Sequence, residues 1–189
     1  MNTLFNKLLD ISLPTQYICN DSNQQIEVNY KWKDIFDIIK SKHWHNDGKL
    51  TCPHAESLYD HLLLCAELTY QKAESFGYSE HDCIKAYFSG LLHDLGKPGT
   101  QKVMGKYLSF KGHAIVGGAL IENFWNPEIE IIFGLTREDW GDISFIADVH
   151  MCTYFPDQTS DTHHFCSQIL PYNVKKMLVH NQTCRFVCN

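Results

Sequence analysis

An adjacent histidine and aspartate lie where an apolar helix is expected to stop, in the stretch Leu91-Leu92-His93-Asp94-Leu95-Gly96-Lys97-Pro98. Imidazole and carboxylate together supply the nitrogen and oxygen donors that suit a divalent metal. Burying such a pair beside leucines is costly unless a metal or another polar group satisfies it. The stretch therefore predicts a metal site at the end of a buried helix.

The composition indicates one folded domain with a substantial core. The chain has 189 residues, of which 44% are hydrophobic and 13% aromatic, and this excludes a disordered chain. A net charge of -6 argues against bulk attraction to nucleic acid or to anionic membranes. No stretch approaches the roughly 20 apolar residues of a membrane span. The eight cysteines are scattered and follow no secretory signal, which favours reduced thiols and a cytoplasmic location.

Apolar residues at helical spacing predict an all-α fold. The first 30 residues look loosely organised, with a turn at Asn20-Asp21-Ser22-Asn23. The helices predicted after them run from Trp32 to Lys40, Pro53 to about Ser75, Ser79 to Asp94, Gly112 to Ile121, Pro127 to Phe133 and Arg137 to Met151, with one or two weaker helices after Ser160. Gly96 and Pro98 are expected to end the third helix. A small β-hairpin is predicted from Thr100 to Phe110, turning at Met104-Gly105.

Histidines occupy the apolar faces of these predicted helices. His61 lies between Leu58 and Cys65 on one stripe, so its side chain is expected to point inward. His113 shares a face with Val116, Gly117 and Leu120. Glycines at 90, 117 and 118 would let neighbouring helices approach closely.

The order of these residues resembles the ligand order of the HD-domain metal-dependent phosphohydrolases. His61 matches the first histidine of that family, His93-Asp94 the doublet, and His113 and His150 the two histidines that follow. The resemblance covers roughly residues 54–152, and the run from Gly90 to Ile121 looks especially like the HD domain of tRNA nucleotidyltransferases.

The resemblance implies an HD-domain-like helical bundle, with residues 1–50 as an N-terminal helical extension and 51–189 as the HD-type domain of a single compact whole. It implies a metal held by His61, His93, Asp94, His113 and His150. One or two divalent transition metal ions are expected, drawn from manganese, iron, nickel, cobalt and zinc, with magnesium as a further option.

The family pattern ends with an aspartate from a helix well after the last histidine. Here only Asp157 and Asp161 follow His150, both in a predicted loop. Three explanations stay open: the chain stops short of that ligand, a loop aspartate replaces it, or the site is incomplete.

Lysines gather after the doublet. Lys97, Lys102, Lys106 and Lys111 lie between Leu95 and Ile121, a run with no acidic residue. Such an excess suits a phosphate-bearing substrate, although a solvated hairpin surface would carry the same pattern. Lys97 is expected to contact the phosphate directly and to act with Asp94 in catalysis, and Lys102 and Lys111 are weaker candidates for phosphate binding.

Two other groups have the short Cys/His spacings that zinc sites use. They are His43, His45, Cys52 and His54 in one segment and His180, Cys184 and Cys188 in another. The first spacing fits no tetrahedral zinc motif well, and His54 could instead contact a ligand of the main site. The second lies in a polar terminus.

By this resemblance, the chain is expected to be a phosphohydrolase acting on a nucleotide or other phosphoester. The nearest substrates would be nucleoside monophosphates, cyclic nucleotides or the terminal phosphates of RNA. One alternative is a non-catalytic HD domain that binds a nucleotide or a partner. The other is a di-iron oxygenase, since some HD proteins use the same ligands for oxygen chemistry.

Overall fold

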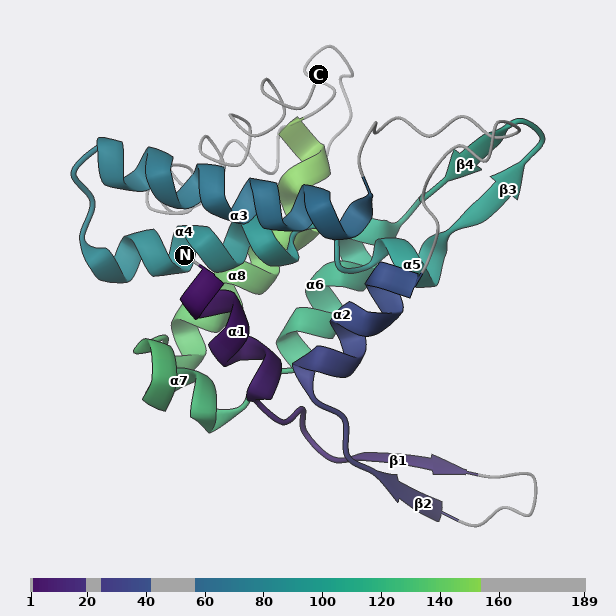
Figure 1. Ribbon diagram of the computed structural model, residues 1–189. Helices are drawn as coiled ribbons and strands as arrows, with labels where there is room; N and C mark the ends of the chain where they lie inside the picture. Colours follow the sequence, from purple (N-terminus) through teal and green to yellow (C-terminus); the bar gives the residue numbers. More distant parts are fainter. Residues whose placement is uncertain (1, 20–24, 42–56, 154–189) are drawn as a thin grey trace.

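The computed structural model describes residues 2–19, 25–41 and 57–153 and confirms a helical bundle with a small hairpin after the His-Asp doublet. Figure 1 shows two hairpins that project from the helical body at separate places. The elements are α1 (Asn2–Asp10), β1 (Gln16–Cys19), β2 (Gln25–Val28), α2 (Trp32–Ser41), α3 (Leu58–Ser75), α4 (Glu80–Leu92), α5 (Lys97–Thr100), β3 (Lys102–Met104), β4 (Tyr107–Ser109), α6 (His113–Asn123), α7 (Pro127–Phe133) and α8 (Arg137–Val149), followed by a 3-10 turn over His150–Thr153.

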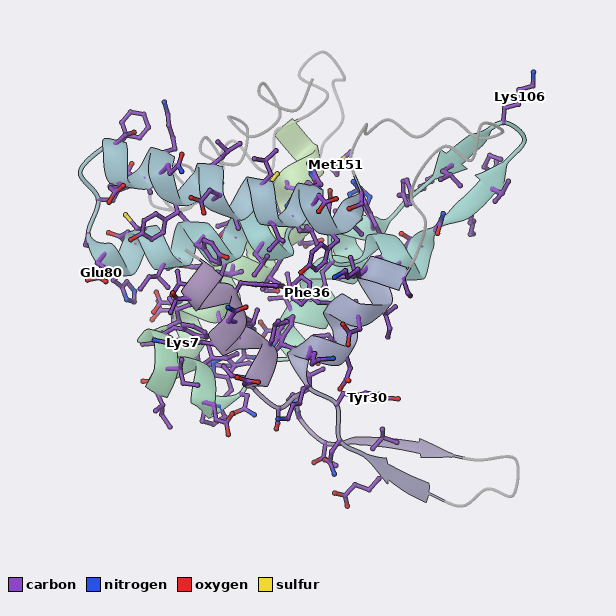
Figure 2. The ribbon with its side chains drawn as sticks, in the orientation of Figure 1. Lys7, Tyr30, Phe36, Glu80, Lys106 and Met151 are labelled. Carbon is purple, nitrogen blue, oxygen red and sulfur yellow. The ribbon has the colours of Figure 1, made fainter. Side chains whose placement is uncertain are left out.

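The N-terminal region is more ordered than the sequence predicted. Helix α1 and the antiparallel pair β1–β2 precede α2, with Cys19 opposite Gln25. Phe5 of α1 packs edge-on against Phe36 of α2, with ring centroids 4.9 Å apart, and Figure 2 shows Phe36 within the helical body. Trp32 of α2 contacts Trp140 of α8. The aromatic core therefore joins the first helices to the last.

Three of the differences between the predicted and observed element boundaries have a clear local cause. Helix α3 begins at Leu58 and not at Pro53, because the Ser57 hydroxyl accepts a hydrogen bond from the Asp60 backbone N–H and caps the helix there. Pro98 does not end a helix but lies in the first turn of the short α5, a position where proline needs no N–H partner. The second hairpin turns at Gly105–Lys106, since Met104 already pairs with Tyr107.

Helices α3 and α4 pack along each other, as do α6 and α8, and α4 also contacts α8 (Figure 1). The buried face of α6 consists of His113, Ala114, Gly117, Gly118 and Ile121. Val116, expected on that face, is 37% exposed, because the helix packs through its glycines. None of the helices in the described ranges is long and apolar enough to span a bilayer.

Candidate metal centre

Asp94 lies at the centre of the site and is only 3% exposed. Helix α4 ends at Leu92, and His93 continues its backbone geometry for one residue. A turn then forms, in which the Lys97 backbone N–H donates to the Asp94 carbonyl. The doublet is thereby held between α4 and α5, with the carboxylate turned inward.

All four predicted histidines converge on the Asp94 carboxylate. On its Oδ1 side, His113 Nε2 lies at 3.0 Å and His150 Nε2 at 3.3 Å. On its Oδ2 side, His93 Nε2 lies at 3.1 Å and His61 Nε2 at 3.6 Å. These side chains come from α3, the end of α4, the start of α6 and the turn after α8. Residues far apart in sequence therefore meet at one carboxylate.

Backbone carbonyls set the orientation of three of these rings. The Nδ1–carbonyl pairs are His93 with Gly90 at 2.8 Å, His113 with Phe110 at 2.7 Å and His150 with Ala147 at 2.6 Å. A carbonyl can only accept, so Nδ1 donates in each pair, and in a neutral ring Nε2 is left as an acceptor facing Asp94. Burial also lowers the pKa of His93, which favours its neutral form.

Acceptor atoms of Asp94, His113 and His150 therefore face one another at the centre of the site. His113 Nε2 and His150 Nε2 lie 3.2 Å apart. Asp94 Oδ1 is buried and has no hydrogen-bond partner within the described residues. Burial alone would raise the pKa of Asp94, but His93 and Lys97 outweigh that effect and hold this pKa well below its usual range. A carboxylate surrounded by nitrogen lone pairs fits a cation.

The donors form two groups that could each hold an ion. One consists of Asp94, His113 and His150, and the other of His61, Cys65 and His93, with the ligand atoms of each group within 4.8 Å of one another. Donor atoms at zinc-like bond lengths of about 2.1 Å lie roughly 3.4 Å apart in a tetrahedral site. The nitrogen–oxygen distances of 3.0 to 3.6 Å around Asp94 are close to that value.

Lys97 differs from the prediction in its surroundings. The sequence has no acidic residue between Leu95 and Ile121, yet Lys97 Nζ lies 2.6 Å from Asp94 Oδ2 and the residue is only 6% exposed. The backbone turn between α4 and α5 brings residues three apart to the same side, so the doublet itself neutralises the lysine. Lys102, Lys106 and Lys111 are exposed, and Lys106 extends from the tip of the β3–β4 hairpin (Figure 2).

Glycines let the elements that carry the predicted ligands approach closely, as expected for positions 90, 117 and 118. A Cβ at Gly90 would lie 2.6 Å from the Cys65 carbonyl oxygen, and one at Gly118 would lie 2.9 Å from Asp148 Cβ. The closest approach is at Gly96, where a Cβ would lie 2.1 Å from the His113 carbonyl oxygen. Larger residues there would separate the doublet from His61 and His113.

Cys65 is the site residue that the sequence analysis missed. Its Sγ lies 3.6 Å from His61 Nε2. The available signal was the spacing, because residues four apart on a helix share a face. Several other candidates lie outside the described residues, namely His43, His45, Cys52, His54, Asp157, Asp161, His180, Cys184 and Cys188.

One protein-family model matches the part of the chain that carries the candidate metal centre. The family model described as HD domain matches residues 58–152, which is half of the chain and includes all five predicted ligands. No curated protein and no solved structure matches the chain. With the predicted ligands in the expected order and four histidines around one buried aspartate, the chain belongs to the HD domain family.

Proposed function

We propose that this protein is a metal-dependent phosphohydrolase that acts on a nucleotide or another phosphoester. The observation that carries the proposal is the buried Asp94 carboxylate, which meets the Nε2 atoms of four histidines. The HD domain family belongs to a superfamily of metal-dependent phosphohydrolases, and the ligand order of this chain agrees with it.

Asp94 is the residue proposed to organise the site. Its Oδ2 faces His61 and His93, whereas its Oδ1 faces His113 and His150. The carboxylate is thus able to serve one ion or to bridge two. A divalent ion bound there would withdraw charge from a phosphoryl oxygen and lower the pKa of a bound water toward neutrality.

Lys97 is proposed to contact the substrate phosphate. Its ammonium lies 2.6 Å from Asp94 Oδ2 and 5.6 Å from the centre of the Phe110 ring, so a phosphoryl group beside the ligands would be within its reach. Removing one such electrostatic contact costs on the order of 2–4 kcal/mol of transition-state stabilisation. The exposed Lys102 and Lys111 would add a weaker, salt-sensitive attraction.

Metal content and hydrolysis measured on the same preparations test the proposal. Wild type, Asp94→Asn and Lys97→Ala are compared, with Lys7→Ala as the control because Lys7 lies on an exposed face of α1 (Figure 2). The substrates are phosphomonoesters and 2′,3′- and 3′,5′-cyclic nucleotides, assayed with manganese, iron, nickel, cobalt, zinc and magnesium. Asp94→Asn is expected to lose both metal and activity, and Lys97→Ala to lose activity alone.

Other outcomes identify the alternatives. Metal-loaded wild type that is inert on the whole panel but binds nucleotide would indicate a non-catalytic binding domain. Two irons per chain with oxygen consumption would indicate the oxygenase. Equal metal content in wild type and Asp94→Asn would refute the site itself.

A further inference from the structure

We infer that Cys65 is a metal ligand, so that His61, Cys65, His93 and Asp94 form a four-donor site for zinc or a similar thiophilic divalent ion. The inference rests on the proposed metal binding at Asp94 and adds a ligand outside the histidine and aspartate pattern that identified the family.

The positions of the donor atoms support this inference. His61 and Cys65 lie one turn apart on α3, with Cys65 Sγ 3.6 Å from His61 Nε2. Zinc bonds of about 2.1 Å to nitrogen and 2.3 Å to sulfur place the two donors roughly 3.6 Å apart in a tetrahedral site. The Nε2 atoms of His61 and His93 lie 3.6 and 3.1 Å from Asp94 Oδ2, around the roughly 3.4 Å expected for nitrogen and oxygen.

The packing of α3 against α4 keeps the thiol at this place. Cys65 is 2% exposed, and its carbonyl oxygen lies where Gly90 of α4 has no side chain. A buried cysteine often serves only as a small apolar residue. Here the sulfur faces an imidazole nitrogen on its own helix and belongs with His93 to a group of potential ligands.

The charges of the site give an independent reason. In the two donor groups of the described residues, Asp94 is the one carboxylate, and its Oδ2 is already paired with the Lys97 ammonium. The neutral histidines add no charge, so a divalent ion on this side would leave an excess of two positive charges in a buried place. Such an excess is costly. A thiolate at Cys65, whose proton leaves to solvent as the metal–sulfur bond forms, would remove one of them.

The donor set also selects the ion. Thiolate and imidazole together suit zinc and other late or soft divalent metals, whereas magnesium prefers oxygen donors. The inference therefore narrows the range of ions that the histidines and aspartate alone would accept.

Cobalt and zinc serve as the probes for a test that does not depend on activity. The chain is saturated with cobalt, and the near-ultraviolet thiolate-to-cobalt absorption is recorded; zinc-edge X-ray absorption then measures the ligand shell. We expect the absorption band and a sulfur shell at about 2.3 Å. Cys65→Ser should lose both and bind zinc at least roughly tenfold more weakly.

Cys83→Ser is the matched control, because Cys83 is equally buried but belongs to a separate cluster with Ala73 and Ala86. This variant should keep the band and the sulfur shell. Saturated wild type with nitrogen and oxygen ligands alone would overturn the inference and leave the proposed metal binding intact. A sulfur shell that persists in Cys65→Ser would also overturn it. Wild type that binds neither ion would refute both proposals.

Discussion

Replacing Gly90 by alanine tests whether the close approach of α3 and α4 builds the site. The new Cβ would lie 2.4 Å from Thr69 Oγ1 and 2.6 Å from the Cys65 carbonyl oxygen. The Thr69 hydroxyl donates to that same carbonyl at 2.8 Å, so it cannot turn away without losing a buried hydrogen bond. The backbone oxygen must instead move by at least 0.4 Å to reach 3.0 Å, a separation below which real Cβ contacts essentially never fall.

The change in the free energy of unfolding caused by Gly90→Ala is the sum of two opposing contributions. Overpacking against the backbone destabilises the folded protein by up to about 3 kcal/mol. Alanine in place of glycine inside a helix stabilises it by about 1 kcal/mol. Gly90→Ala is therefore expected to destabilise the protein by about 2 kcal/mol. Gly141→Ala is the matched control, because Gly141 also lies inside a helix but a Cβ there would meet nothing within 4 Å. It should stabilise by roughly 0.5–1 kcal/mol.

Urea unfolding of both variants in the presence of chelator measures these free energies without any contribution from bound metal. Gly90→Ala should unfold at lower urea than wild type and Gly141→Ala at higher urea. If both substitutions shift the midpoint in the same direction by similar amounts, the helix contact at Gly90 is not tight and the reasoning is refuted.

Three further predictions concern residues away from the metal centre. Two test the ion pairs of Lys85, and the third tests a buried hydrogen bond of Trp140. Lys85→Met should destabilise by roughly 1–3 kcal/mol in urea unfolding, because Lys85 Nζ lies 2.9 Å from Asp139 and also pairs with Asp142 in a partly buried place. Burial would raise the pKa of Asp139, but hydrogen bonds, the largest from Lys85, hold it well below 3.8. Asp139 thus contributes stability that is present above pH 3.8 and lost as the pH falls below it, so the difference between wild type and Asp139→Asn should narrow in that range. Trp140→Phe should cost about 1–3 kcal/mol by thermal unfolding, since its Nε1–H donates to the Ile121 carbonyl at 2.7 Å inside the core.

The sequence predicted those features that depend on local pattern and motif order. Helix α7 begins and ends at the predicted Pro127 and Phe133, because a proline in the first turn and a glycine after the last are strong signals. The convergence of His61, His113 and His150 on Asp94 followed from their order in the family pattern and not from any local property. The close packing at Gly90 was predicted because glycine on a buried helix face usually serves a close contact.

The features that the sequence did not predict depend on very short segments or on contacts that form only in the folded chain. The strands Gln16–Cys19 and Gln25–Val28 have four residues each. Four residues are the shortest run that can indicate a strand, and only the second of the two alternates between polar and apolar residues. The start of α3 was predicted at Pro53, because proline suits the first position of a helix. The structure uses the other start signal in this segment, the Ser57 cap on the Asp60 backbone N–H. The pairing of Lys97 with Asp94 depends on the turn between α4 and α5. The Gly-Lys-Pro sequence predicted only that the helix ends there.

The pairing of Lys97 makes the two sides of Asp94 unequal. On the Oδ2 side the ammonium already supplies a positive charge at 2.6 Å. On the Oδ1 side the buried oxygen has no hydrogen-bond partner within the described part of the chain, and it faces His113 and His150 at 3.0 and 3.3 Å. A cation entering the Oδ1 side meets acceptors, whereas one entering the Oδ2 side must compete with Lys97. An additional anionic ligand is therefore needed most on the Oδ2 side, which is the side where Cys65 lies beside His61.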